Sequence, residues 1–332
     1  MRVNVTENRL QWIGIVALIA FGGHAPAASA QWKPTRTIEI VAPATPGGGY
    51  DTQARTLQRF LQEAKLLPVP SVIVNRPGAG GSLGWASLNQ SPQEGHAVAV
   101  ASTTVITNEV LGLGGVKHTD LTPLAILATE YLVFSVRSDS KLRTGKDLLD
   151  SLKQSATALK FATAPGPGNG NHILIGTIAR AAGVDVKQVP VVFFKSAAES
   201  ATALLGGHVD CVVGSIPPIA QFLKNNSLRV LALGAPQRHT GMMANVPTWR
   251  ESGVDAVFLN WRGVVGPRAM SPAQVSYWES VLERLAKTPE WTRNVEHDFQ
   301  INDYKSSAET RALWNTQYNE IRASMAQLGL IK

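Results

Sequence analysis

Two glycine-rich segments each follow a predicted strand and precede a predicted helix, and together they offer the chemistry of anion binding. The first contains Pro46, Gly47, Gly48, Gly49, Tyr50 and Asp51, and the second contains Gly166, Gly168, Asn169 and His172. Glycine exposes bare backbone N–H groups, and a helix N-terminus adds unpaired N–H groups with a partial positive charge. Such a pair of segments predicts a site for a carboxylate or a phosphate.

These segments also fit less specific roles. Glycine-rich connections between a strand and a helix often serve only as tight turns, and a single histidine such as His172 more often has a structural role. Ser102 and Thr103, at the end of another predicted strand, add hydroxyl groups that could contact a ligand or cap a helix. The residues alone leave these alternatives open.

The sequence lacks the motifs of nucleotide binding and of hydrolysis. Gly145-Lys146-Asp147 does not complete a Walker A loop, and Leu83 stands where a dinucleotide-binding fingerprint that begins at Gly78 would need glycine. No G-x-S-x-G elbow and no H-E-x-x-H zinc motif occur in the sequence. The single cysteine, Cys211, excludes a disulfide framework and a cysteine-built metal site. We therefore expect no cofactor, no metal ion and no enzymatic activity.

The elements that must position these residues alternate between strands and helices. Strands are predicted at 37–42, 71–75 and 96–101, with helices at 51–64 and 85–90. The alternation resumes with strands at 132–136, 160–163, 189–194, 209–213 and 229–233, helices at 145–154, 171–182, 196–205 and 217–224, and two long helices at 272–287 and 307–327. This order predicts an α/β fold with mostly parallel sheets, arranged as two lobes.

The N-terminus has the three parts of a secretory signal peptide. Arg2 and Arg9 precede the apolar run 12–23, and Ala28-Ser29-Ala30 offers a cleavage site. That run is shorter than the ~20 residues of a membrane-spanning helix. We therefore expect residues 1–30 to be a signal peptide and the mature protein to be periplasmic. The net charge of +7 comes without the basic and aromatic runs of a nucleic-acid-binding protein, so it fits an ordinary surface or attraction of small anions.

Short motifs spread along the chain resemble those of one family of transport receptors. They are Ile40-Val41-Ala42-Pro43 leading to Pro46-Gly47-Gly48-Gly49-Tyr50-Asp51, Val74-Asn75-Arg76-Pro77-Gly78-Ala79-Gly80-Gly81, Leu204-Leu205-Gly206-Gly207-His208-Val209-Asp210, Asn245-Val246-Pro247-Thr248 and Gly266-Pro267. On these motifs the chain resembles the periplasmic solute receptors of tripartite tricarboxylate transporters, also called Bug-type receptors. The resemblance implies a type II periplasmic binding protein, in which two α/β lobes close on a ligand in the cleft between them. It also implies two crossing strands, with lobe 1 at 31–134 plus 259–332 and lobe 2 at 135–258.

The resemblance further implies which residues contact the ligand. Besides the residues named above, it indicates Gly214 and Ser215 at a strand end, together with Lys195 and Ser196, where many members read Lys-Gly-Ser and this chain lacks the glycine. Many members have Trp-Phe-Gly at the return crossing, whereas this chain has Trp261-Arg262-Gly263, similar to receptors of the citrate and tricarballylate type. A guanidinium group can bind a carboxylate through two parallel hydrogen bonds. Arg262 is therefore expected either to hold a carboxylate of the ligand or to pair with a surface acid.

These observations predict a monomeric receptor for a small di- or tricarboxylate with a citrate-like character. The resemblance implies delivery of that ligand to the large and small membrane subunits of a tripartite tricarboxylate transporter. The alternatives are a receptor for aromatic acids or amino acids, with Tyr50 and Trp261 as an apolar wall, a sensor subunit that reports ligand occupancy to a membrane kinase, and a secreted hydrolase. No nucleic-acid partner is expected.

Overall fold

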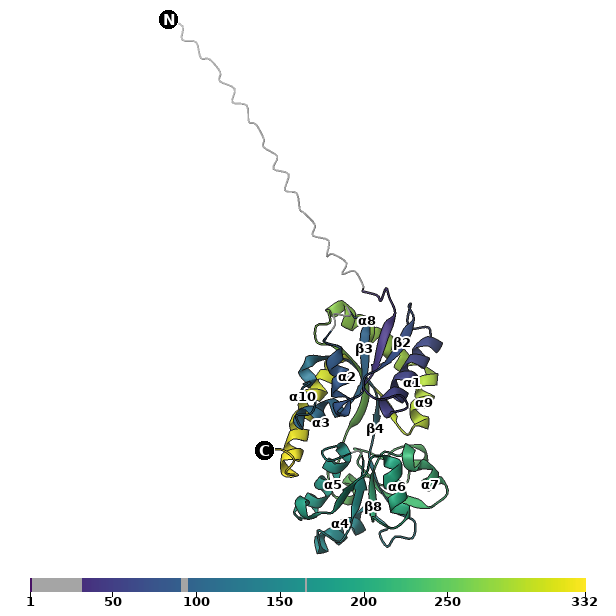
Figure 1. Cartoon of the computed structure of the whole chain (residues 1–332), viewed down its shortest axis with the longest axis vertical. Helices are drawn as coiled ribbons and strands as arrows, with labels where there is room; N and C mark the ends of the chain where they lie inside the picture. The colour runs from purple at the N-terminus through teal and green to yellow at the C-terminus, as the bar shows by residue number, and fades with distance from the viewer. Residues whose placement is uncertain (2–31, 91–94, 165) are drawn as a thin grey trace. The chain divides into compact units, whose positions relative to one another are not determined.

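Two β-sheets, one in each lobe, form the framework of the molecule (Figure 1). The computed structural model describes Met1 and residues 32–90, 95–164 and 166–332, and Trp32–Lys332 form one compact unit. Apart from Met1, the predicted signal peptide at 1–30 lies outside the described residues.

The first lobe is built on a six-stranded sheet with the order β11-β4-β10-β3-β1-β2. Its strands are β1 (Ile38–Ala42), β2 (Ser71–Asn75), β3 (Ala97–Ser102), β4 (Leu121–Glu130), β10 (Asn260–Pro267) and β11 (Ile301–Lys305). The β1–β2 and β1–β3 pairs are parallel, whereas β10 is antiparallel to β3 and β4, and β11 is antiparallel to β4. The expectation of a mostly parallel sheet is wrong here, because β4, β10 and β11 are absent from the predicted elements.

The second lobe contains a five-stranded sheet with the order β7-β6-β8-β5-β9. Its strands are β5 (Val133–Arg137), β6 (Phe161–Thr163), β7 (Val191–Phe193), β8 (Cys211–Gly214) and β9 (Leu228–Leu233). The β6–β7 and β6–β8 pairs are parallel, and β5 is antiparallel to β8 and β9. Val133 and Phe134 therefore pair within the second sheet, so the change of sheet falls slightly before the boundary expected at 134.

Two short connections join the lobes. Leu132 lies on the first, between β4 and β5, and Phe258 lies on the second, just before β10. The N–H of Gly234 donates to the carbonyl of Leu132 (2.8 Å), and the carbonyl of Gly234 accepts from the N–H of Phe258 (3.2 Å). Both connections are thus hydrogen-bonded to one residue, which holds them close together at the junction.

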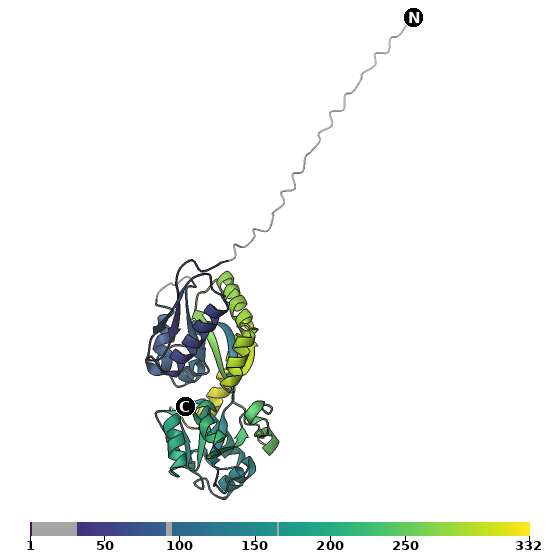
Figure 2. The same ribbon diagram turned by 90° about the vertical axis from the view of Figure 1, so that its right-hand side faces the viewer.

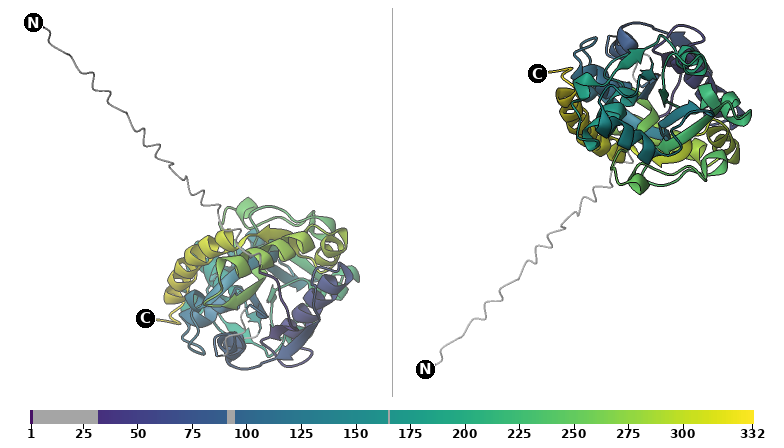
Figure 3. Two further views of the ribbon diagram at one scale, coloured as in Figure 1. Left: turned by 90° about the horizontal axis from the view of Figure 1, so that it is seen from above. Right: turned by 90° about the horizontal axis from the view of Figure 1, so that it is seen from below.

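Helices cover both sheets (Figure 2). They are α1 (Gly49–Glu63), α2 (Ser82–Ser87), α3 (Thr104–Val110), α4 (Gly145–Gln154), α5 (Gly170–Ala181), α6 (Ala197–Leu205), α7 (Ala220–Lys224), α8 (Pro272–Ala286), α9 (Pro289–His297) and α10 (Ser307–Gln327). The C-terminal helices, coloured light green to yellow, lie together on one side of the first lobe (Figures 2 and 3). The chain end beyond α10 reaches the second lobe, where the side chain of Leu328 packs against Gly176 of α5, 2.5 Å from the position that a Cβ atom would take.

Helix α1 shows how the sequence positions the first glycine-rich segment. Ala54, Leu57 and Leu61 are buried at the three- and four-residue intervals that the sequence predicts for this helix. Their packing against the first sheet fixes the helix axis, which carries Gly49 and Tyr50 at its N-terminus to the sheet edge where β3 ends. The helix predicted at 51–64 is therefore confirmed, with a start two residues earlier.

Candidate functional site

A cavity of about 190 Å³ lies between the two lobes. The first lobe supplies hydroxyl, carboxylate, amide and guanidinium groups, the second lobe supplies the start of α5 and a serine, and the two connections supply apolar side chains. The lining residues are Thr103, Thr104, Thr107, Glu130, Asn260 and Arg262, then Ala164, Asn169, Gly170, Asn171 and Ser215, then Leu132 and Phe258. Polar groups from both lobes therefore converge on one small space.

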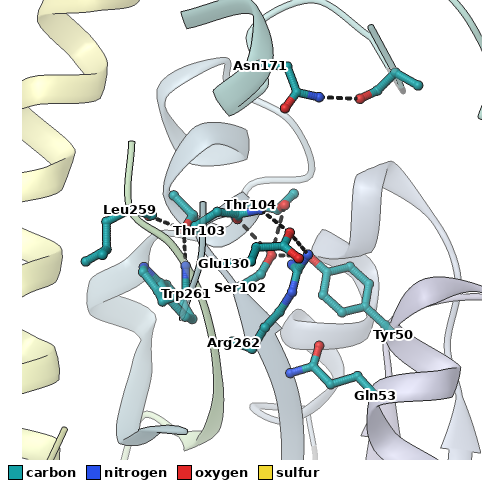
Figure 4. Close-up of polar contacts among 12 residues, drawn as sticks. Tyr50, Gln53, Ser102, Thr103, Thr104, Glu130, Asn171, Leu259, Trp261 and Arg262 are labelled. Atoms are coloured by element: carbon teal, nitrogen blue, oxygen red, sulfur yellow. Dashed lines mark hydrogen bonds and ion pairs between the residues drawn. The ribbon is translucent and has the colours of Figure 1, made fainter. Parts of the chain in front are cut away.

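The hydroxyl groups at the end of β3 form an ordered chain of hydrogen bonds (Figure 4). The Oγ of Ser102 lies 2.7 Å from the hydroxyl of Tyr50 and donates to the Oγ1 of Thr104 at 3.0 Å. The Oγ1 of Thr103 donates to the carbonyl of Leu259 (3.1 Å) and accepts from the N–H of Trp261 (3.2 Å). These contacts tie the site to the return connection and fix the positions of its hydroxyl groups.

Helix α5 brings its N-terminus to the cavity from the second lobe. The Oδ1 of Asn169 accepts from the N–H of His172 (3.0 Å), and its Nδ2 donates to the carbonyl of Gly166 (2.6 Å). A side chain on Gly170 would lie only 2.3 Å from the ring of Phe258, so glycine is required where the helix meets the return connection. The first N–H groups of a helix have no acceptor within the helix and favour an anion.

Arg262 forms an ion pair inside the site. Its Nη2 lies 2.5 Å from the Oε1 of Glu130, and the Nδ2 of Asn260 donates to the same oxygen at 2.6 Å. The side chain of Glu130 is 6% exposed and that of Arg262 is 28% exposed. Arg262 is expected either to hold a ligand carboxylate or to pair with a surface acid. The structure shows it paired with an acid, Glu130, which is buried and lines the same cavity as Arg262. Figure 4 shows Glu130, Arg262, Ser102 and Tyr50 gathered together, with Asn171 across from them.

A second cavity, of about 590 Å³, adjoins the first. Thr104 and Arg262 line both cavities, and Gly49 and Tyr50 line the larger one. Tyr50 packs edge-on against Trp85, with ring centroids 5.6 Å apart, and burial raises the pKa of its hydroxyl. The first glycine-rich segment therefore faces the larger cavity, and the second faces the smaller one.

Six of the predicted site residues line these two cavities. They are Thr103, Asn169, Ser215 and Arg262 in the smaller cavity and Gly49, Tyr50 and again Arg262 in the larger. The other predicted residues line neither of the two: Pro46, Gly47, Gly48, Asp51, Ser102, Gly166, Gly168, His172, Lys195, Ser196, Gly214 and Trp261.

Asp51 holds the first glycine-rich segment in place. Its carboxylate is buried, with the residue 2% exposed, and accepts from Arg55 Nε, Gly47 N and Asn75 Nδ2, each at 2.9 Å. The hydrogen bond with Arg55, followed by those with Gly47 and Asn75, holds the pKa of Asp51 well below its usual range. Gly47 has a φ of +79°, which glycine adopts without strain. Asp51 thus shapes the segment and does not face the cavity.

His172 has a corresponding role in the second segment. Its Nδ1 accepts from the N–H of Gly168 (3.2 Å), and its ring packs against Phe193. Burial lowers the pKa of His172, which favours the neutral ring that this hydrogen bond requires. These contacts agree with a structural role for His172 in the second segment.

Lys195 and Ser196 lie at the N-terminus of α6. Both residues are exposed, and Ser196 caps the helix by accepting from the N–H of Glu199 (3.2 Å). The backbone N–H of Lys195 donates to the carboxylate of Glu199. Neither residue lines either of the two cavities, so the geometry does not support their expected contact with the ligand.

Trp261 cannot form the apolar wall of the cleft that the aromatic-acid alternative requires. The residue is fully buried, its Nε1 donates to Gln317 (2.9 Å), and its ring stacks on Trp314 with centroids 5.5 Å apart. Side chains alternate across a strand, so Trp261 points to α10 while Arg262 points to the cavities. The expectation is wrong for Trp261 because its ring belongs to the core.

Several lining residues are absent from the predicted site. Glu130, Asn260, Thr104 and Asn171 all line the smaller cavity. Glu130 and Asn260 are direct partners in the β4–β10 register, and neither strand is among the predicted elements. A prediction of β4 would have placed Glu130 at its carboxyl end, where ligand sites of α/β sheets commonly lie.

The described residues contain neither a membrane-spanning helix nor a cluster of metal-binding side chains. No helix among them is long and apolar enough to cross a membrane. Nor do three or more histidine, cysteine or acidic side chains gather there as a metal site would require. Cys211 is buried in β8, and burial raises the pKa of its thiol, as expected for a core residue.

Two α/β lobes joined by two connections, with a polar cavity between them, define a type II periplasmic binding protein. The family model described as the tripartite tricarboxylate transporter family receptor matches residues 54–330. The chain belongs to this family, whose members are solute-binding receptors of the periplasm and not enzymes. The predicted family and fold are thereby confirmed.

Individual relatives agree with this assignment. Protein BugT of Bordetella pertussis is 28% identical over 271 residues, which cover 80% of this chain and 81% of BugT. A TctC solute-binding protein from Polaromonas, solved without a ligand, is similar with a TM-score of 0.76 at 25% identity, covering 89% of this chain and 99% of that one. The R. palustris protein Rpa4515, solved with adipate, shares the fold with a TM-score of 0.75 at 21% identity, covering 89% of this chain and 98% of that one.

Proposed function

We propose that this protein is a periplasmic receptor that captures one small carboxylate between its lobes. It then delivers the ligand to the large and small membrane subunits of a tripartite tricarboxylate transporter. The observation that carries the proposal is the convergence of Thr103, Thr104 and Arg262 with Asn171 and Ser215 on one cavity of about 190 Å³.

The chemistry of the cavity favours a carboxylate. The N-terminus of α5 supplies backbone donors with a partial positive charge, and hydroxyl and guanidinium groups supply further donors from the first lobe. Each lobe alone would leave half of the anion in contact with water, so binding favours the closed arrangement. The adipate in the solved structure of Rpa4515 supports the same ligand class.

The charges in the cavity favour a mono- or dicarboxylate over a citrate-like acid. Arg262 and Glu130 are the charged residues among those that line the smaller cavity, and they neutralise each other. A tricarboxylate would bring three negative charges to a space without a free cation among its described lining residues. A citrate-like ligand, which the sequence resemblance implies, is therefore the weaker candidate.

The proposed site of action is the periplasm, reached by cleavage of the predicted signal peptide at 1–30. The receptor is proposed to act as a monomer. No group of the site is assigned a catalytic role, and the ligand leaves it unchanged.

A thermal-shift screen tests this function. Purified mature protein is heated with a panel of mono-, di- and tricarboxylates, amino acids and neutral sugars, because a ligand that binds only the folded state raises the melting temperature. We expect carboxylates alone to raise it, and recovery of the unaltered acid after incubation. A panel in which no carboxylate stabilises the protein would contradict the proposal, and turnover of a panel of esters and amides would favour the hydrolase alternative.

A further inference from the structure

The larger cavity lies directly beside the proposed carboxylate site and differs from it in character. It has a volume of about 590 Å³, and its lining includes six buried apolar residues: Leu57, Val100, Leu127, Val264, Trp291 and Val295. Its neutral polar residues include Thr52, Gln53, Thr56 and Gln300. Thr104 and Arg262 line both cavities, so the two adjoin at the proposed carboxylate site.

We propose that the larger cavity receives the apolar body of the ligand, so that the protein binds a carboxylic acid that carries an aliphatic chain or an aromatic ring. This inference rests on the proposed function, since it takes the carboxylate to lie in the smaller cavity beside Arg262.

The strand register explains how one ligand reaches both cavities. Val264 pairs with Val100 and Arg262 pairs with Ser102 across β10 and β3. Residues two apart on a strand project from the same face, so Arg262 and Val264 follow each other along one surface. The apolar floor therefore continues directly from the guanidinium group, and a chain attached to a carboxylate at Arg262 would extend over Val264 and Val100.

Aromatic and aliphatic side chains form part of the side walls of the larger cavity. Tyr50 contributes its ring from α1, because its hydroxyl is already bonded to Ser102 (2.7 Å) and its edge packs against Trp85. Trp291 and Val295 project from α9 on the other side, and both are more than nine-tenths buried. A ring or an aliphatic chain would bury its surface against these side chains, beside the indole Nε1 of Trp291, which has no hydrogen-bond partner in the described structure.

The distribution of charge indicates that the far end of the ligand is neutral. Asp298 is the one charged residue besides Arg262 among the described residues that line the larger cavity, and it belongs to the C-terminal end of α9. A second carboxylate at the far end would meet this acid, with no cation beside it in the lining. The cavity therefore favours an apolar end over an anionic one.

Calorimetric titration of three acids tests the inference. Acetate and hexanoate share one carboxylate and differ in chain length, and adipate adds a carboxylate to the chain of hexanoate. We expect hexanoate to bind at least about tenfold more tightly than acetate, because burial of each methylene contributes to affinity. Equal affinity for acetate and hexanoate would overturn the inference but leave the proposed function intact, whereas no binding of any acid would overturn both.

Two substitutions locate the chain. Thr56→Trp fills the larger cavity from α1 and should weaken hexanoate binding at least about tenfold while acetate stays within about twofold, since only the chain loses its space. Gln62→Trp, exposed on the same helix outside the cavity lining, is the matched control and should change neither affinity. Unchanged hexanoate binding by Thr56→Trp would overturn the inference.

The second substitution places a cation at the far end. Asp298 has a side chain that is 48% exposed, so Asp298→Lys should fold even where Thr56→Trp does not. It should raise the ratio of adipate to hexanoate affinity at least about fivefold, because the distal carboxylate of adipate gains an opposite charge. An unchanged ratio would show that the chain does not enter this cavity and would overturn the inference.

Discussion

The Nη2 of Arg262 and the Oε1 of Glu130 lie 2.5 Å apart on the neighbouring strands β10 and β4. Both side chains line the cavity in which we place the carboxylate, and the acid is the more deeply buried of the two. The cation that could bind a ligand carboxylate is therefore already balanced within the protein. Any acid that binds there must share Arg262 with Glu130, which makes this pair a determinant of ligand charge.

Glu130→Gln should increase the affinity for a dicarboxylate. The neutral amide leaves Arg262 without its internal counter-charge, while its oxygen can still accept from Asn260, so adipate should bind about tenfold more tightly, or about 1.4 kcal/mol. Calorimetric titration measures the change, and Glu290→Gln, an exposed acid distant in sequence, serves as control. Unchanged or weaker binding would mean that Glu130 does not limit the charge of the ligand.

Arg262→Ala should weaken carboxylate binding. A hydrogen bond to a charged group contributes about 1.5–3 kcal/mol, and its loss should appear in titrations with the tightest-binding acid. Arg268→Ala, whose arginine side chain is 67% exposed, is the control and should bind as the wild type does. If the affinity of Arg262→Ala is unchanged, Arg262 does not contact the ligand.

Arg262→Ala should also lower the melting temperature. The substitution leaves the buried carboxylate of Glu130 without a cation, which is unfavourable in a poorly hydrated site. Adding Glu130→Gln to Arg262→Ala should restore the melting temperature but not the affinity. A double variant as unstable as the single one would show that the ion pair is not the cause of the loss.

Asn169→Ala should lower both stability and affinity. It removes the N-cap of α5, at a cost of about 1 kcal/mol, and frees the segment that presents Gly170 and Asn171 to the cavity. Thr144→Ala removes the N-cap of α4, outside the lining of both cavities, and should cost a similar stability with no change in affinity. Chemical unfolding and calorimetry on both variants separate the two effects, and equal affinities would contradict the role of Asn169.

Asp51→Asn should reduce the acid sensitivity of the protein. The lowered pKa of Asp51 means that its contribution to stability is present above its ordinary pKa of 3.8 and is lost as the pH falls below that value. The melting temperature of the variant should be lower than that of the wild type at about pH 7, and the difference should shrink towards about pH 3. A difference that is independent of pH would show that the ionised carboxylate of Asp51 does not hold the segment.

The sequence predicts the regular α/β parts of the fold well, because glycine-rich turns and helical periodicity mark them. Strand β4 escapes prediction because all ten of its residues are buried, so its pattern does not alternate, and because Pro123 lies within it. Without β4 and β10, neither the antiparallel pairing of the first sheet nor the pairing of Glu130 with Arg262 can be foreseen.

The sequence predicts the types of chemical group at the candidate site, but it does not predict which side chains point into the cavity. Glycine-rich segments and hydroxyl groups at strand ends can be read directly from neighbouring residues in the sequence. Which side chains face the cavity depends on packing between distant elements, as Trp261 and Arg262 illustrate. The two are adjacent in sequence, yet the stacking of Trp261 on Trp314 of α10 turns Arg262 towards the ligand site.

A crystal structure of the protein with its tightest-binding carboxylate tests the central claim most directly. We predict that the carboxylate group contacts Thr104 or Arg262 from the first lobe and the start of α5 or Ser215 from the second lobe at the same time. An acid bound outside the cavity between the lobes, or held by groups of only one lobe, would contradict the account.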